Sequence, residues 1–250
     1  MEFKKTALAA ATLAFIMGSG YASAFNLYPG DDTAASTLLE DDDVDYFVDN
    51  DGDGLISVGD VLVAPFEFGA IRDIFPPISG GSPQILDTSK DELTGISTIK
   101  VKSIDAASGR VVFEQDGNTP VLAIYSDDGS GNDADMSNCG LMAQCVADAS
   151  DGKGLWASFT IDTVADPDTG WVFNPVVPGA PGALDPSQIA ATSQLDKVGI
   201  ANFALTLVAN NSGYQFQDFD IGATKCGLLH GAGGCPGDGK ASLSGSADIL

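Results

Sequence analysis

Apolar and polar residues alternate with a period of two along much of the chain. In Gly199–Ala209 (GIANFALTLVA) the side chains of Phe203, Leu205 and Leu207 share one face, and 155–161 (LWASFTI) alternates in the same way. This spacing is typical of strands that bury one face, because successive side chains of a strand point to opposite sides. Further strands are predicted at 97–104, 110–115, 121–126 and 240–250.

Two segments depart from this pattern. In 214–222 (YQFQDFDIG) the phase changes, since Tyr214 and Phe216 share one face whereas Phe219 and Ile221 share the other. A change of phase predicts a bulge or a break in the strand. Only 185–198 (DPSQIAATSQLDKV) has a helical pattern, with an Asp at the N-cap and a Pro at the first helical position.

The many short strands and the shortage of helix predict a mainly β protein, either a β-sandwich or a jelly roll. No repeat of fixed period is present, which argues against a propeller or a solenoid. The connector 75–84 (FPPISGGSPQ) is rich in Pro, Gly and Ser and marks the best internal boundary. We therefore expect a leader at 1–24, a small N-terminal segment at 25–84 and a β-sandwich domain at 85–250.

The leader has the pattern of a cleaved secretory signal. Lys4 and Lys5 precede an apolar run at 6–17, and Ala22, Ser23 and Ala24 have the spacing that a signal peptidase accepts. A retained membrane anchor is the alternative, although the run is short for a spanning helix. No second apolar segment of spanning length follows, so we expect no membrane span in the mature chain. The expected location is secreted or cell-surface, with the periplasm as a further option.

The chain is strongly acidic, with 11 Lys and Arg against 35 Asp and Glu and a net charge of −24. Such a surface repels nucleic acid and attracts cations, so we expect no nucleic-acid partner. Only five of the acidic residues are Glu. Asp is common in turns and in oxygen-rich metal loops, which agrees with a turn-rich β protein. Adaptation to salty surroundings is an alternative explanation of the charge.

The four cysteines form two close pairs in the sequence, Cys139 with Cys145 and Cys226 with Cys235. In an exported protein an even number of cysteines at short spacing indicates disulfides. Three pairings are possible, and the local one is the simplest. A zinc site with four thiolates is the alternative, but neither pair has the C-x2-C spacing typical of zinc knuckles.

The acidic stretch Asp49–Asp60 (DNDGDGLISVGD) has the spacing of a calcium-binding loop. Asp49, Asp51 and Asp53 stand at alternate positions, and a glycine follows where the chain must turn sharply. Ile56 is the apolar residue expected to anchor the loop to the core. The predicted metal ligands are Asp49, Asp51, Asp53, the backbone carbonyl of Leu55, Ser57 acting through water, and Asp60.

This loop resembles the EF-hand family and, more narrowly, the calcium loop of dockerin modules, in which Asp commonly stands last. A dockerin carries two loops, whereas this chain has one, and the Gly and Pro that follow allow at most a short exiting helix. The alternative is a solvated acidic loop without metal. Mutual repulsion of the carboxylates favours a bound cation. The acidic cluster at 127–135 lacks this spacing and is predicted to be a plain loop, although a second calcium site there is left open.

Residues suited to catalysis are few. His230 is the only histidine, and no G-x-S-x-G motif accompanies it, which argues against a serine hydrolase. A glycoside hydrolase that uses a pair of Asp or Glu carboxylates stays open, because such pairs cannot be singled out among so many acids. Trp156 and Trp171 could form a platform for sugar stacking, or they could belong to the core.

These observations together predict a secreted, non-enzymatic, calcium-stabilised protein of the cell surface or extracellular matrix, with an adhesive or assembly role. The expected partners are calcium and a cell-surface polymer, a polysaccharide or further copies of the chain. The alternatives are a carbohydrate-binding module and a secreted glycoside hydrolase. In general style the chain resembles exported Gram-negative surface proteins, including PEP-CTERM-type proteins, but the sorting tail of that group is absent.

Overall fold

The computed structural model describes twelve stretches of the chain: 13–16, 22–25, 27–28, 37–54, 56–73, 92–127, 139–151, 154–164, 167–175, 199–212, 215–216 and 218–249. Three predictions fall outside these residues. They are the helix at 185–198, the carbonyl ligand of Leu55, and most of the second acidic cluster, residues 128–138.

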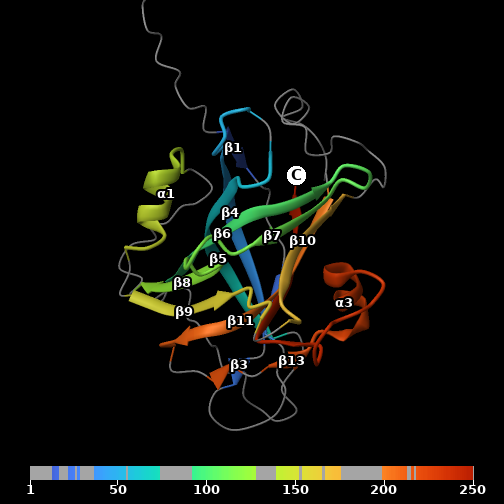
Figure 1. Cartoon of the computed structure of the whole chain (residues 1–250). Helices are drawn as coiled ribbons and strands as arrows, with labels where there is room; N and C mark the ends of the chain where they lie inside the picture. The colour runs from blue at the N-terminus through green and yellow to red at the C-terminus, as the bar shows by residue number, and fades with distance from the viewer. Residues whose placement is uncertain are drawn as a thin grey trace, which may run out of the picture.

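The fold is mainly β, as the alternating pattern predicts (Figure 1). The described residues form two helices, α1 (Met142–Asp148) and α3 (Gly222–His230). The strands are β1 (Leu13–Ile16), β2 (Ala22–Phe25), β3 (Leu27–Tyr28), β4 (Thr37–Val48), β5 (Val61–Asp73), β6 (Glu92–Asp105), β7 (Arg110–Glu114), β8 (Leu122–Asp127), β9 (Gly154–Thr160), β10 (Gly170–Pro175), β11 (Gly199–Asn210), β12 (Gln215–Phe216), β13 (Phe219–Asp220), β14 (Lys240–Ala241) and β15 (Leu243–Ile249).

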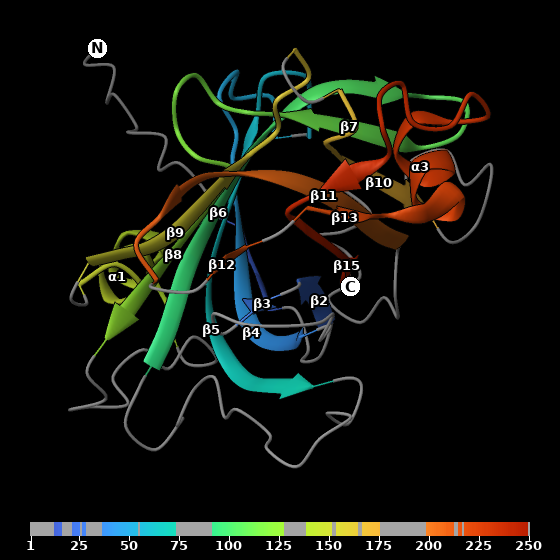
Figure 2. The same ribbon diagram turned by 90° about the horizontal axis from the view of Figure 1, so that it is seen from below.

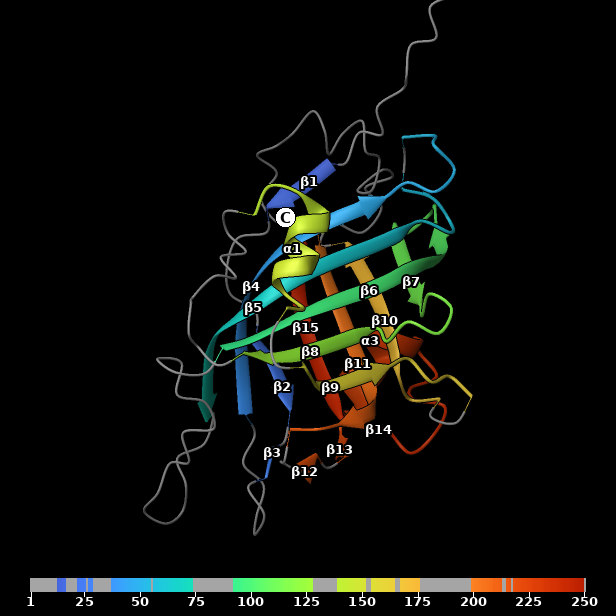
Figure 3. The ribbon, with the colours of Figure 1, turned by 90° about the vertical axis from the view of Figure 1, so that its left-hand side faces the viewer.

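The large antiparallel sheet folds into two layers that pack face to face. The first layer contains β4, β5, the first half of β6, β8 and β9. The second contains β15, the first half of β11, β10, β7 and the end of β6. Figure 3 shows the strands of the two layers crossing one another at a steep angle. This is the sandwich-like arrangement that the sequence predicts.

Two long strands belong to both layers and connect them at the corners of the sandwich. β6 pairs first with β8 and then with β7, and its register shifts between Val101 and Ser103. β11 pairs first with β10 and β15 and then with β9, with a shift between Leu207 and Ala209. Such irregularities bend a strand and let it pass from one sheet to the next.

The main core fills the space between the two layers. Its fully buried side chains include Ile99, Phe159, Phe173 and Leu205, which come from β6, β9, β10 and β11. The prediction that β11 buries one of its two alternating faces is therefore confirmed for the side that lies against the main core. Part of the outer face of β11 is buried too, because Ala204 packs beneath α3, whereas Val208 is 61% exposed.

The two helices cover opposite sides of the molecule, and Figure 2 shows them far apart at its two ends. α1 packs near Tyr46 of β4, and α3 packs on β10 and β11. Each helix carries one cysteine of a local disulfide, Cys139–Cys145 or Cys226–Cys235. The predicted local pairing is thus confirmed, and all four thiols are oxidised, which contradicts the zinc alternative.

The acidic loop joins two strands, β4 and β5, and is followed by a strand instead of the exiting helix of an EF-hand. β4, which includes the acidic run 40–45, pairs with β5 on the far side of the loop. β5 contains Pro65 although it lies between β4 and β6. The paired positions of β4 and β5 are interrupted at Ala64 and Pro65, so the missing N–H falls where the ladder is already broken.

The sheet is continuous across the predicted boundary at 84/85, because β5 pairs with β6. β1 and β2 pair with β4, and β2 pairs with β15 as well. Both strands fall almost entirely within the predicted leader, so cleavage after Ala24 would take these pairings from the mature chain. Among the described residues, no helix is both long enough and apolar enough to cross a membrane.

Candidate functional site

The acidic loop forms the tip of the β4–β5 hairpin, directly after the paired residues Val48 and Val61. The side chains of Asp49, Asp51 and Asp53 are exposed, and each can offer a carboxylate oxygen within 4.8 Å of the others. Three of the predicted ligands are therefore close enough together to share one cation.

Glycines and backbone amides give the loop its shape. The carboxylate of Asp49 accepts hydrogen bonds from the amides of Gly52, at 2.6 Å, and Gly54, at 2.8 Å. These two glycines have φ values of 75° and 76°, in the left-handed region that side chains disfavour. The amide of Gly54 is the main cause of the lowered pKa of Asp49. The loop thus holds Asp49 in its charged form.

Ser57 and Asp60 have different places in the loop. The hydroxyl of Ser57 donates a hydrogen bond of 2.9 Å to Asp51, so this side chain lies beside the cluster. Asp60 is only 1% exposed, and its two oxygens accept the amides of Asn50, at 2.9 Å, and Ser57, at 2.7 Å. In this arrangement Asp60 clamps the base of the loop, and its role as a ligand stays a prediction.

The base of the loop is fastened to the body of the protein. The amide of Gly59 donates to the carbonyl of Val101 at 2.9 Å, and the amide of Val101 donates to the carbonyl of Asp60 at 2.8 Å. Ile56 packs against the main core, as the sequence predicts. A change in how well the loop is ordered would therefore affect the hydrogen bonds between the loop and β6.

The chemistry of the donor set indicates the kind of ion that fits. The cluster offers carboxylate oxygens and a serine hydroxyl, without nitrogen or sulfur. Oxygen donors suit hard cations such as calcium or magnesium, whereas zinc and copper favour sites with imidazole or thiolate. An exposed loop on a hairpin can adapt its geometry, which suits calcium better than the stricter octahedral demands of magnesium.

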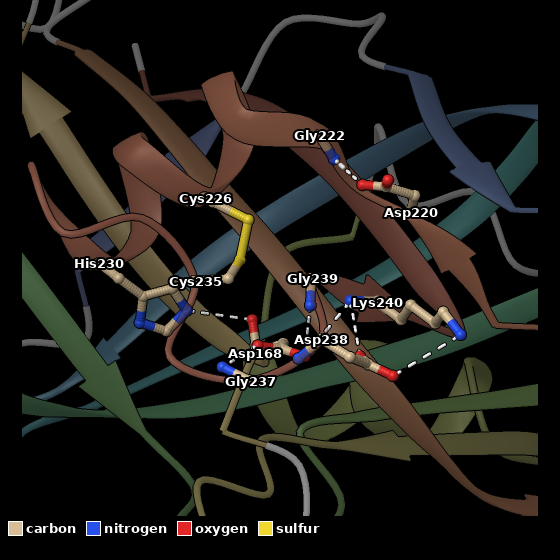
Figure 4. The surroundings of a disulfide bond; sticks show 10 residues. All are labelled: Asp168, Asp220, Gly222, Cys226, His230, Cys235, Gly237, Asp238, Gly239 and Lys240. Atoms are coloured by element: carbon tan, nitrogen blue, oxygen red, sulfur yellow. Dashed lines mark hydrogen bonds and ion pairs between the residues drawn. A yellow bond between two sulfur atoms is a disulfide. The ribbon is translucent and has the colours of Figure 1, made fainter.

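A second polar cluster surrounds Asp168, just before β10 (Figure 4). Asp168 is fully buried, and its carboxylate accepts the four successive backbone amides of residues 237–240 at 2.8–3.3 Å. Burial alone would raise the pKa of Asp168, but these hydrogen bonds and one with Asp238 outweigh it and the pKa is lowered. The cluster fixes the loop that follows the disulfide Cys226–Cys235.

His230 belongs to this second cluster. Its Nε2 lies 3.0 Å from the backbone carbonyl oxygen of Asp168, and Figure 4 shows the ring beside the disulfide loop. A backbone carbonyl is neither a nucleophile nor an orienting carboxylate, so this contact is structural. The spacing of residues along the chain did not indicate the role of Asp168, because its hydrogen-bond partners lie about 70 residues further on.

Both tryptophans lie in the main core. Trp156 is 8% exposed and Trp171 is 9% exposed. Trp171 stacks on Phe203 with ring centroids 4.5 Å apart, and Trp156 meets Phe216 edge to face. Neither indole offers the open face that a sugar needs. The suggested carbohydrate-binding platform is therefore wrong for these residues.

Comparisons with known proteins do not place the chain in a family. No family model matches the chain, and neither the curated proteins nor the solved structures contain a match. The protein is thus defined by its own features as a mainly β, two-disulfide chain with an acidic cluster on a hairpin. The resemblance to EF-hand and dockerin loops depends on residues 49–60 alone.

Proposed function

We propose that the loop 49–60 binds calcium, and that the protein is an exported, non-enzymatic component of the cell surface or extracellular matrix which calcium stabilises. The observation that supports this most directly is the convergence of Asp49, Asp51 and Asp53 on one exposed hairpin tip. Their mutual repulsion is relieved when a divalent cation lies among them.

The flanking strands suggest what binding does. In sensor EF-hands, calcium changes the angle between two helices and exposes a groove. Here the loop joins two strands that are paired up to its base at Val48 and Val61. We therefore expect calcium to order the hairpin tip without opening a surface. A stabilising ion suits an adhesive or matrix protein that must stay folded outside the cell.

The export part of the proposal is supported by the leader pattern at 1–24 and by two disulfides, which persist in oxidising compartments. The partners proposed with it are a surface polymer, a polysaccharide or further copies of the chain. With a net charge of −24, the protein would bind an anionic polymer poorly unless calcium neutralised part of its surface.

Calcium should raise the melting temperature of the mature, oxidised protein. An ion that binds only the folded state adds about 2.7 kcal/mol of stability at a hundredfold excess over its Kd. Asp51→Asn keeps the shape of the side chain but removes one charge from the cluster, so most of the calcium-dependent gain should be lost. Thermal melts in chelator and in calcium, with a calorimetric titration for stoichiometry, measure both effects.

Asp105→Asn is a matched control. Asp105 is an exposed residue at the end of β6 that accepts hydrogen bonds from the amide of Ala107 and the hydroxyl of Ser108, and it lies outside the acidic loop. Its variant should keep the full calcium-dependent gain. Identical melting curves of the unaltered protein in chelator and in calcium would exclude the proposal.

A further inference from the structure

Lys225 of α3 has unusual surroundings for a lysine in so acidic a protein. Its Nζ donates hydrogen bonds to the backbone carbonyl of Gly245 at 2.8 Å, to Oδ1 of Asn202 at 3.0 Å and to Oγ of Ser246 at 3.0 Å. All three of these acceptors are neutral. Two other described lysines differ, since Lys100 and Lys240 form ion pairs with nearby carboxylates.

We propose that Lys225 and Asn202 become joined by an intramolecular isopeptide bond between Nζ of the lysine and Cγ of the asparagine. The amine is held against the oxygen of the carboxamide, one covalent bond away from the carbon that it would attack. Asn202 lies on β11 and is only 4% exposed, so water has little access to compete as the nucleophile. Holding an amine and a carboxamide together in this way replaces an encounter in solution with a step inside one molecule.

Ser246 supplies a path for the proton. Its hydroxyl accepts a hydrogen bond from Nζ of Lys225 and donates one of 3.1 Å to Oδ1 of Asn202. The hydroxyl can therefore take a proton from the attacking amine and pass its own proton to the carboxamide oxygen. The register supports this placement, because Ser246 of β15 is the cross-strand partner of Asn202. Proton transfer by a positioned group is the usual way to ease such an attack.

The reaction balances without any other reagent. The lone pair of the neutral amine forms the new C–N bond while the proton lost by Nζ reaches the carboxamide oxygen. When the C=O double bond re-forms, that proton passes to Nδ2, the bond between Cγ and Nδ2 breaks, and Nδ2 leaves as ammonia. Attack requires the neutral amine, and burial lowers the pKa of Lys225 to about 8. At mildly alkaline pH a large fraction of this lysine is therefore in the reactive form.

The bond would add a covalent link between α3 and the second layer, on which the helix already packs through Leu229 and Ala204. At the N-terminus of α3 the carboxylate of Asp220 accepts the amide of Gly222 at 2.7 Å, and the neighbouring cross-link, Cys226–Cys235, joins the helix only to the loop that follows it. An amide bond between α3 and β11 would persist under reducing conditions that open the disulfide. This inference is independent of calcium binding.

Mass spectrometry of the mature full-length protein, reduced and denatured, tests the proposal. The mass should be lower than that calculated from the sequence by one ammonia, and a digest should contain a branched peptide that links Lys225 to Asn202. Asn202→Asp should lose one water in place of ammonia if the bond still forms. Lys225→Arg keeps the charge and much of the packing but should show its full calculated mass.

Succinimide formation at another asparagine also releases ammonia, so the branched peptide and its absence from Lys225→Arg decide the question. Ser246→Ala should slow the appearance of the bond after refolding. Full calculated mass for the folded, unaltered protein, even after incubation above the pKa of Lys225, would overturn the proposal.

Discussion

Asp168→Ala is expected to destabilise the protein by about 3 kcal/mol or more, because each buried N–H left without an acceptor costs about 1–3 kcal/mol. The carboxylate of Asp168 is the shared acceptor for the amides of residues 237–240. Water can reach some of these amides once the side chain is gone, so the total is smaller than four separate losses. Urea unfolding of the oxidised protein measures the change.

Asp168→Asn separates charge from shape. The amide keeps the volume and one oxygen, but its NH2 group would face backbone N–H donors, so we expect a loss of about 2 kcal/mol. Asp116→Asn is the control, because the side chain of Asp116 is exposed, lies outside this cluster, and makes an ion pair with Lys100 that is a surface contact worth little. A control variant as unstable as Asp168→Asn would show that the buried carboxylate is not what holds this loop.

The contribution of Asp168 should depend on pH. Its pKa in the folded protein lies below the ordinary value of 3.8, so the unfolded chain takes up a proton at a higher pH than the folded one. The stabilisation is therefore complete above pH 3.8 and is lost as the pH falls through the lower folded value. The stability difference between the unaltered protein and Asp168→Asn should shrink over that acidic range. A difference that stays constant there would contradict the proposed role of the charge.

The strands from residue 97 onward could be predicted where their alternation is a local signal. The segments 97–104, 110–115, 121–126 and 155–161 all fall within or very close to observed strands, and the phase change at 214–222 is a real break between β12 and β13. Which strands form each layer could not be predicted, because β6 and β11 change partners midway. The sequence of a strand does not indicate which distant strand pairs with it.

The helices were missed for a physical reason. α1 and α3 are short, and their N-cap residues, Leu141 and Ile221, are apolar and make no side-chain capping bond. Their positions are set by a disulfide and by packing on one face of a sheet, as for Leu229 of α3 beside Ala204. With seven and nine residues, both helices are also shorter than the window over which a period of 3.6 can be recognised.

The candidate site, too, could be predicted only where its signal is local in the sequence. The spacing of Asp49, Asp51 and Asp53 is local, and the structure brings these three residues together. Asp60 looks equivalent to them in the sequence, but it is buried at the base of the loop and binds two amides. Asp168 and Lys225 gave no sequence signal, because their partners come from other parts of the chain.

Gly95→Ala is expected to destabilise the protein by about 3 kcal/mol, the upper end of the usual cost of overpacking a core. Gly95 of β6 lies between Phe66 of β5 and Ile124 of β8. A Cβ atom at this position would lie 2.7 Å from the backbone oxygen of Ala123 and still closer to Cζ of Phe66. Phe66 is 4% exposed and meets Phe68 edge to face, so its ring has little room to move.

Phe66→Leu should relieve part of this clash, so the two substitutions together should cost less than the sum of their separate effects. Such a double-mutant cycle measures the contact between the ring and the glycine directly. Gly227→Ala is the control, because no atom lies within 4 Å of its added methyl group and the residue is in α3. That change should stabilise the helix by up to about 1 kcal/mol. If Gly95→Ala unfolds at the same urea concentration as the unaltered protein, Phe66 does not lie over Gly95, and the packing between β5 and β6 differs from the one described.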